Sequence, residues 1–295
     1  MITIDELLKN KPVLFDGAMG TSIQSLGLEN VDPPELLSIK HPDKLAEIHK
    51  NYINAGSKVI ETNTFGGSGA RLVLTGLGDK VKELNIAAAT VAKNAAGNSV
   101  YVAGSVGPSG LLIEPFGNTP RVKVKNYFRE QIDALLEGGV DIILIETMIS
   151  LDEALIALEA ANEAGSTMTG VTLTFDIGEQ GIRTSFGDAP LDAAVILKEK
   201  GANFIGSNCG HGFNDMLSVA KELKSVSDLS LLIQPNAGLP TYEDGKIEYN
   251  ESPELYKQFV LDLTKLDVEL IGGCCGTTYE HIKLGAEVVN SKGKK

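Results

Sequence analysis

The 295-residue chain lacks tryptophan and contains few aromatic residues of any kind, 5% in total. It is also poor in positive charge, with 26 Lys and Arg against 39 Asp and Glu, which gives a formal net charge of −13. Nucleic acids and anionic membrane surfaces both require a basic face, so we expect neither as a partner. The one basic cluster lies at 291–295, which we interpret as a flexible basic tail.

Long hydrophobic runs are also missing from the sequence. No run approaches the roughly 18 apolar residues that span a membrane. The first 17 residues contain no apolar stretch long enough for a signal peptide. The sequence therefore predicts a cytoplasmic protein without a membrane segment.

Cysteine is scarce, and its odd count of three argues against a disulfide framework. Cys209 stands alone in Ser-Asn-Cys-Gly-His-Gly, whereas Cys274 and Cys275 are adjacent in Gly-Gly-Cys-Cys-Gly-Thr. A lone free cysteine is usually a small buried hydrophobic residue. Three cysteines in glycine-flanked turns suggest a shared role instead.

Short β-branched apolar runs alternate along the chain with amphipathic segments. Strands are predicted at 12–15, 58–62, 100–104, 141–146, 169–174, 203–207, 231–234 and 268–272. Helices are predicted at 43–55, 80–96, 122–137, 151–164, 191–200, 215–225, 253–265 and 279–289. Eight strand–helix units predict an α/β fold, a single-domain (β/α)8 TIM barrel over residues 1–290. A doubly wound open sheet is the alternative, disfavoured because no strand is followed by G-x-G-x-x-G.

Polar residues follow the predicted strands where each strand ends. In a barrel of this type the active site is built at the carboxyl ends of the strands. The residues at these positions are Asp16, Glu61, Asn63, Ser105, Glu146, Cys209, Asn236, Cys274 and Cys275. All three cysteines should therefore meet several acids and amides on one rim.

The predicted strands that precede Cys209 and Cys274 lie two positions apart in a closed barrel, about 10 Å. Three thiolates could then share a metal, and Zn²⁺ is the natural candidate for such ligands. Adjacent cysteines need a turn to reach one ion, and neighbouring glycines such as Gly273 and Gly276 permit it. Because C-x-x-C pairs are absent, we expect a site assembled by the fold, with an open fourth position as in catalytic zinc.

Two residues are candidates for the fourth position on the metal. The side-chain oxygen of Asn236 could be a ligand that substrate displaces. His211, two residues past Cys209, is the alternative and would close the site into a structural one. The other histidines, His41, His49 and His281, fall on or before helices, and we expect them at the surface.

Acids at the rim suggest a cationic ligand. Asp16 could pair with a cationic group, and the glycine-permitted turn after it could bind an anion through backbone amides. Glu146 follows a buried strand, where a lone carboxylate is costly, so it should face a ligand or a structural ion pair. The same expectation applies less strongly to Glu61, because the polar side chains of Thr62 and Asn63 can solvate its carboxylate.

These residues fall in motifs that resemble a known family. The motifs are Asp-Gly-Ala-Met-Gly-Thr (16–21), Glu-Thr-Asn-Thr-Phe (61–65), Gly-Ser-Val-Gly-Pro (104–108), Glu-Thr (146–147), Asn-Cys-Gly (208–210) and Gly-Gly-Cys-Cys-Gly-Thr (272–277). Together they resemble the zinc-dependent homocysteine S-methyltransferases over nearly the whole chain. Ile-Glu-Pro-Phe-Gly (113–117) and Gln-Pro-Asn-Ala-Gly-Leu-Pro (234–240) are most similar to the N-terminal homocysteine-binding module of cobalamin-dependent methionine synthase.

The resemblance implies a function and a set of site residues. It implies zinc on the three cysteines, homocysteine bound through its thiol to that zinc, and a methyl transfer that yields methionine. The substrate amino group would bind Asp16 and Glu146, with Ser105 and Asn63 nearby. The substrate carboxylate would bind amides of Ala18, Met19, Gly20 and Thr21. The catalytic set is then Cys209, Cys274, Cys275 and Glu146.

The methyl donor is where the chain departs from some relatives. Betaine-using relatives hold the donor with aromatics, but this chain has Gly66 and Thr147 where they carry tyrosine. We expect a methyl-corrinoid protein or methylcobalamin, supplied by folate and cobalamin modules or by other chains. S-methylmethionine or S-adenosylmethionine is the alternative donor. A non-catalytic, zinc-stabilised corrinoid-docking subunit is the competing role, and a metal-dependent lyase is disfavoured because carbonyl chemistry rarely uses three thiolates.

Overall fold

Eight parallel strands form the central sheet of the computed structural model, which describes residues 2–243 and 246–292. The hydrogen-bonded order is β1, β12, β9, β8, β5, β4, β3, β2. The strands are β1 (Val13–Leu14), β2 (Val59–Glu61), β3 (Tyr101–Val106), β4 (Ile142–Met148), β5 (Thr169–Leu173), β8 (Phe204–Cys209), β9 (Ser230–Pro235) and β12 (Leu270–Ile271). Chain order is thus followed around the sheet, as the predicted βα repeat requires.

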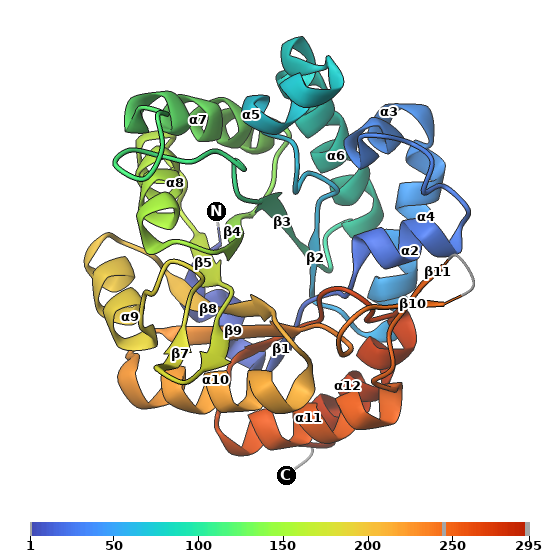
Figure 1. Cartoon of the computed structure of the whole chain (residues 1–295). Helices are drawn as coiled ribbons and strands as arrows, with labels where there is room; N and C mark the ends of the chain where they lie inside the picture. The colour runs from blue at the N-terminus through green and yellow to red at the C-terminus, as the bar shows by residue number, and fades with distance from the viewer. Residues whose placement is uncertain (1, 244–245, 293–295) are drawn as a thin grey trace.

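The sheet closes where β1 meets β2. The Lys58 amide donates a hydrogen bond to the Leu14 carbonyl at 2.7 Å. One step further along, the Asp16 carboxylate accepts the Glu61 amide at 2.9 Å. Figure 1 shows the resulting ring of strands with helices around it. The predicted (β/α)8 barrel is therefore confirmed.

Eight long helices cover the outside of the ring (Figure 1). They are α4 (Pro42–Ala55), α6 (Val81–Ala96), α7 (Arg121–Glu137), α8 (Leu151–Glu163), α9 (Pro190–Glu199), α10 (Phe213–Val226), α11 (Pro253–Lys265) and α12 (Tyr279–Lys292). Each predicted strand–helix unit is present, with ends shifted by three residues or fewer. Helix α12 includes two residues of the predicted tail, and 293–295 lie outside the described residues, so the predicted domain limits stay a prediction.

The inside of the barrel is filled with side chains rather than open. Phe15 and Phe204 meet there edge to face, with ring centroids 6.4 Å apart. Gly170 makes room for Phe204, because a Cβ at that position would lie 2.1 Å from the ring. Gly206 similarly lets β8 pass close to Leu232 of β9, whose carbonyl oxygen would lie 1.7 Å from an added Cβ. Because the interior is packed, space for a ligand is left only at the rim.

The short elements were not predicted. They are α1 (Ile4–Leu7), α2 (Met19–Ser25), α3 (Leu37–Lys40), α5 (Gly69–Leu72), η1 (Leu8–Asn10), η2 (Pro34–Leu36), η3 (Val73–Thr75), η4 (Gly78–Lys80), β6 (Asp176–Gly178), β7 (Gly181–Arg183), β10 (Thr241–Glu243) and β11 (Lys246–Glu248). Segments this short carry too few residues for a periodic hydrophobic pattern. Those after β1, β2, β5 and β9 lie in the loops at the carboxyl ends of the strands. None of the helices within the described ranges is long and apolar enough to cross a membrane.

Two of the histidines are buried, so the prediction that they lie at the surface is wrong for them. His49 is fully buried on the inner face of α4, where it shares a helical stripe with Leu45, Ile48 and Tyr52. His281 is 5% exposed, and its two ring nitrogens lie 3.1 Å from the Thr278 amide and 3.0 Å from the Glu251 carbonyl. The error arose because a histidine on a helix says nothing about which face it occupies.

We expect His49 to make the fold sensitive to acid. Burial lowers the pKa of His49 to about 4, and neither ring nitrogen has a hydrogen-bond partner among the described residues. This pKa lies below the value of about 6.5 in the unfolded chain. The part of the unfolding free energy that depends on a neutral His49 is therefore present at neutral pH and is lost as the pH falls from 6.5 toward 4. Between pH 7 and 5 the wild type should lose about 2 kcal/mol more unfolding free energy than His49→Leu. Urea unfolding at both pH values measures this. Exposed His211→Leu is the control, and equal losses in wild type and His49→Leu would contradict the prediction.

Candidate active site

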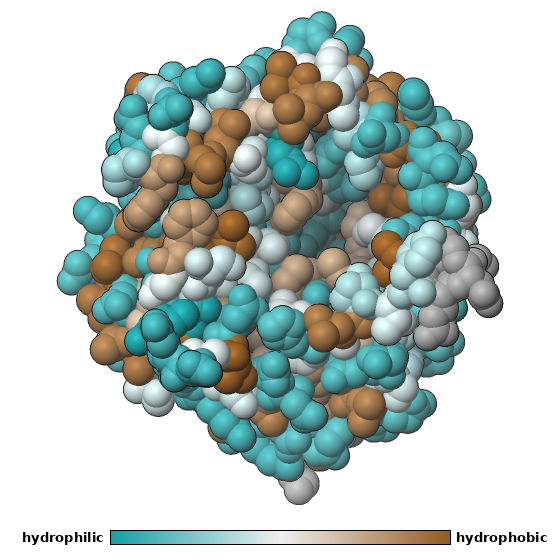
Figure 2. Space-filling view, viewed as in Figure 1, coloured by the Kyte–Doolittle hydropathy of each residue, from teal (hydrophilic) through white to brown (hydrophobic). Residues whose placement is uncertain are grey.

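A cavity of about 480 Å³ opens at the carboxyl ends of the strands. Figure 2 shows it as a hollow in the centre of this face of the molecule. Its lining includes most of the predicted site residues: Asp16, Ala18, Met19, Gly20, Thr21, Asn63, Ser105, Glu146, Cys209, Cys274 and Cys275. With Gln234 of β9, which also lines the cavity, residues from seven of the eight strand ends meet there.

The three cysteines form a compact cluster in this cavity. Their Sγ atoms all lie within 4.8 Å of one another, and Sγ of Cys209 and Cys274 are 3.2 Å apart. Sulfurs on a tetrahedral zinc ion with Zn–S bonds of 2.3 Å would be separated by about 3.8 Å. No His, Asp or Glu in the described part of the chain joins the cluster. The sulfurs therefore form a three-ligand set with a spacing that suits zinc.

The backbone turns that aim the cysteines are held in unusual conformations. Cys209 has φ +65°, which is uncommon for a residue with a side chain. The Cys274 amide donates to the Pro235 carbonyl at 2.8 Å, and the Cys275 carbonyl accepts the Ala237 amide at 2.9 Å. The loop after β9 thus holds both adjacent cysteines, which a regular strand would send to opposite faces.

Tyr249 also lies at the cluster, although the sequence carried no signal for it. Its ring packs on Gly276, where an added Cβ would lie 2.2 Å from the ring and φ is +80°. Burial, followed by the charge of Cys275, raises the pKa of Tyr249 to about 12. Tyr249 follows the β10–β11 hairpin, so no motif of its own connected it with the cysteines.

The two candidates for the fourth ligand are placed differently. The Asn236 side chain donates to the Gly210 carbonyl at 2.9 Å, and its Oδ1 is buried without a hydrogen-bond partner in the described structure. An unsatisfied buried oxygen beside the cysteine loops suits a displaceable ligand. His211 is exposed, and its ring lies 3.8 Å from Asp176 and 3.7 Å from Asp215. It is not part of the cysteine cluster, which removes the alternative of a four-ligand structural site built with His211.

The thiols share their protons unequally. Hydrogen bonds from Cys209 and Cys274 lower the pKa of Cys275 to about 3. Hydrogen bonds with Cys209 and Cys275, together with burial, raise the pKa of Cys274 well above its usual range. Without a cation nearby, the three sulfur atoms cannot all be deprotonated at once. A cluster of this kind suits a metal ion that binds thiolates, and Zn²⁺ is such an ion.

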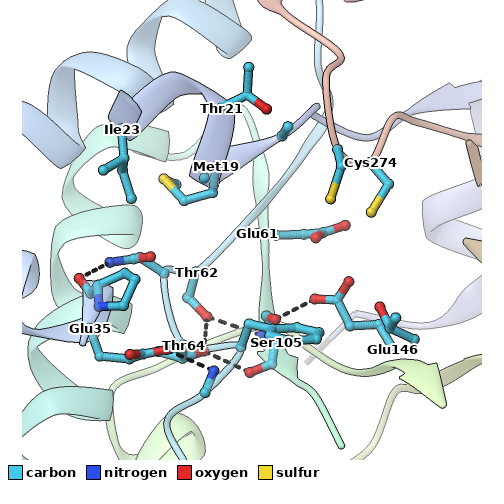
Figure 3. A pocket seen from close by; sticks show the side chains of 18 of the residues that line it. Met19, Thr21, Ile23, Glu35, Glu61, Thr62, Thr64, Ser105, Glu146 and Cys274 are labelled. Atoms are coloured by element: carbon cyan, nitrogen blue, oxygen red, sulfur yellow. Dashed lines mark hydrogen bonds between the residues drawn. The ribbon is translucent and has the colours of Figure 1, made fainter. Parts of the chain in front are cut away.

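Three carboxylates gather beside the cysteines, as Figure 3 shows for Glu61 and Glu146. Asp16 and Glu146 are 2% and 7% exposed, and Glu61 is partly buried. Burial is the main cause that raises the pKa of all three, and it brings that of Glu146 to about 7. A site where carboxylates are unfavourably charged favours a cationic ligand.

Glu146 is aimed into the cavity by its strand and by two side chains. The pairing of β4 with β5 shifts register between Ile145 and Met148, and Thr147 has φ +60°. Ser105 donates its hydroxyl proton to Glu146 Oε1, and the Asn208 amide lies 3.3 Å from Oε2. A bulge that redirects one side chain is a common device beside active sites.

The turn after β1 is the start of a helix rather than an isolated nest. Helix α2 begins at Met19, so the first-turn amides of Met19, Gly20 and Thr21 have no partner within the helix. The Ala18 amide instead donates to the Thr277 carbonyl at 3.3 Å and to its hydroxyl at 3.2 Å. The three helix amides therefore remain for an anion, whereas the Ala18 amide is already used.

The cavity continues outward past Asn63 to residues that the sequence did not indicate. The Asn63 amide donates to the Pro34 carbonyl at 2.7 Å. Glu35 is 5% exposed and accepts the Gly66 amide at 2.7 Å, and Arg71 lines the same outer part. Glu35 lies in η2 and Arg71 in α5, two short elements that no strand end or motif marked.

Comparisons with known proteins identify relatives of this chain. A family model described as homocysteine S-methyltransferase matches residues 13–289. The methionine synthase of Mycobacterium tuberculosis is 30% identical over 97% of this chain and 25% of its own length. That of Mycobacterium leprae is 30% identical over 96% and 25%. The chain thus spans about a quarter of the length of these curated relatives.

Solved structures show the same fold. The homocysteine methyltransferase MmuM from Escherichia coli in its oxidized form has a TM-score of 0.80 and 23% identity, covering 98% of both chains. Its metallated form has a TM-score of 0.79 and 23% identity, covering 95% of this chain and 98% of that one. At this identity the likeness supports the fold alone. By the match of the family model over nearly its whole length, the chain belongs to the homocysteine S-methyltransferase family.

Proposed function

We propose that this methyltransferase binds Zn²⁺ through Cys209, Cys274 and Cys275 and methylates the thiol of homocysteine to give methionine. The observation that carries the proposal is the cluster of three Sγ atoms within 4.8 Å, in the cavity that also holds Asp16 and Glu146. When bound, zinc would supply the Lewis acidity that keeps the substrate sulfur deprotonated and nucleophilic near neutral pH, where a free thiol with pKa of about 8.5 is mostly protonated.

The protein's own residues would orient the substrate. Asp16 and Glu146 would accept hydrogen bonds from its ammonium group, with Ser105 holding Glu146 in place. The amides of Met19 to Thr21, at the positive end of α2, would bind its carboxylate. Asn63 lines the same cavity as a further contact. Held through both groups on its Cα, the substrate would direct its side-chain thiol toward the cysteines, where the thiol would displace Asn236 as the fourth ligand of the zinc.

For the methyl transfer itself, the protein has to do little more than hold the substrate and the donor in position. The lone pair of the substrate sulfur forms the new S–CH₃ bond as the bond between the methyl group and its donor breaks, and that electron pair stays with the donor. The thiol proton leaves to solvent when the substrate binds. Alignment of sulfur, methyl and leaving group is the contribution that a preformed cavity can make.

Two classes of donor are supported by different observations. Similarity to methionine synthases about four times as long as this chain supports a methyl-corrinoid protein or methylcobalamin, delivered by folate and cobalamin modules. A sulfonium donor, S-methylmethionine or S-adenosylmethionine, is supported by the charge of the cavity. Five carboxylates line it (Asp16, Asp32, Glu35, Glu61 and Glu146), and Arg71 is the one Lys or Arg among its described lining residues. Such a surface favours a cationic donor that becomes neutral on losing its methyl group.

We expect the protein to bind zinc in a 1:1 ratio through the cysteines. Cys275→Ala should lose the metal and the methyl transfer together, because two thiolates and a neutral oxygen make a weak zinc site. Metal content measured by mass spectrometry after dialysis against a mild chelator checks this. His211→Ala, a change just outside the cluster, should keep both. Full methyl transfer by a metal-free preparation would contradict the proposal.

Homocysteine should be consumed when a suitable donor is present. The measurement is methionine formation by the zinc-loaded protein with methylcobalamin, a methylated corrinoid protein, S-methylmethionine, S-adenosylmethionine or betaine. At least one of the first four should support turnover and betaine should not. Homocysteine binding should also release a proton, because coordination of the thiol deprotonates it. A non-catalytic zinc-stabilised subunit would show no turnover and no proton release.

A further inference from the structure

Glu61 has no role in the site described so far, although its position is central. It ends β2, and Figure 3 shows its carboxylate between Cys274 and Glu146. Gln234, which comes from β9 on another part of the ring, donates to Glu61 Oε1 at 2.7 Å. The side chain is therefore held across the mouth of the barrel, with Oε2 free of any partner in the described structure.

Three carboxylates share this space without a cation. The charge of Glu146 raises the pKa of Asp16, and the charges of Glu146 and Asp16 both raise that of Glu61, so the three groups lie close enough to repel one another. None of them forms an ion pair with a Lys, Arg or His of the described residues, and Asp16 Oδ1 is buried without a partner. Grouping acids in this way is unfavourable unless a ligand cation offsets the repulsion.

We propose that Glu61 is the third acceptor for the α-ammonium group of the substrate, beside Asp16 and Glu146. A primary ammonium group carries three N–H donors, and the cavity offers one carboxylate for each. The proposal rests on the proposed function and narrows the class of thiol that the site accepts.

The backbone of the rim presents the three acceptors as a set. The Glu61 amide is bonded to Asp16 Oδ2, which leaves Oδ1 for a ligand. Gln234 donates a hydrogen bond to one carboxylate oxygen of Glu61, and the other oxygen remains available to a ligand. Ser105 and Asn208 hold Glu146 by donating hydrogen bonds to its two carboxylate oxygens. Each carboxylate is thus oriented by the protein before any substrate arrives, which lowers the cost of ordering the site on binding.

This arrangement makes the free primary amine a condition for binding. A thiol without the amine would leave three carboxylates facing one another, and an N-acylated amine supplies one donor where three are wanted. Sites built to hydrogen-bond a polar group reject analogues that lack it, because the protein groups are left unpaired. The acceptor class is therefore α-amino acids with a free primary amine and a side-chain thiol or selenol.

The test compares two ligands on three zinc-loaded proteins by isothermal titration calorimetry. The ligands are homocysteine and 4-mercaptobutanoate, which is the same molecule without its amine. The proteins are wild type, Glu61→Gln and the control Glu153→Gln. Glu153 is also a buried acid, 6% exposed, but it binds the Ser109 amide at 2.8 Å and does not line the cavity.

Wild type should bind homocysteine at least about 100-fold more tightly than the analogue, since hydrogen bonds to charged groups are strong. Glu61→Gln should reduce that preference about 10-fold to 100-fold and leave affinity for the analogue unchanged or improved. Glu153→Gln should keep the wild-type preference. Glu61→Asp, which keeps the charge on a shorter side chain, should restore part of it. A zinc content of 1:1 in every variant confirms that the site is intact.

Two results would overturn the assignment of Glu61. An unchanged preference in Glu61→Gln would show that the ammonium group does not contact it, and equal weakening of both ligands would show that Glu61 only shapes the cavity. Both results would leave homocysteine as the substrate. Failure of the wild type to bind homocysteine at all would instead overturn the proposed function, and the role of Glu61 with it.

Discussion

Closure of a parallel sheet is the constraint on which the rest of this structure depends. Parallel strands in a ring must all present their carboxyl ends at one rim, so the residues that follow them meet whatever their distance in sequence. The closure relies on the Lys58–Leu14 backbone bond and on the Asp16 carboxylate, which accepts the Glu61 amide. A residue of the candidate site, Asp16, therefore also joins β1 to β2, and the fold and the site depend on the same contact.

The side chains that line the cavity carry an excess of acidic groups. The three cysteine thiols lie beside Asp16, Glu61 and Glu146. Burial raises the pKa values of these acids, and a bound cation would stabilise their charged forms. A zinc ion and a substrate ammonium group would offset the two parts of this charge separately. The same negative charge should disfavour a thiol that lacks an amine, and it should disfavour an anionic methyl donor. The proposed metal ion, the ammonium group of the acceptor and a cationic donor would all be complementary to the negative charge of the cavity.

Much of the fold could be predicted from periodicity, and part of the site from strand ends. The eight strand–helix units are long enough to show their pattern, and Cys209, Cys274 and Glu146 lie at or just after the carboxyl ends of their strands. Tyr249 and Glu35 could not be found in this way, because neither follows a strand of the barrel: Tyr249 packs on Gly276 from the segment after β11, and Glu35 lines the cavity from η2. His49 was assigned to the wrong side of its helix, since one histidine does not reveal a helical face. The Ala18 amide is occupied by Thr277, a contact 259 residues away in sequence.

The sequence by itself determined the number of βα units, the rim at which polar residues gather and the three cysteines that meet there. These follow from local rules: hydrophobic period, turn residues and the polarity of a parallel strand. Only the tertiary structure decided that His211 turns away from the cysteines, that Asn236 keeps an unsatisfied oxygen, and that Glu61 faces two other acids. Those facts depend on side-chain direction and on contacts between distant segments, and packing of the whole chain settles both.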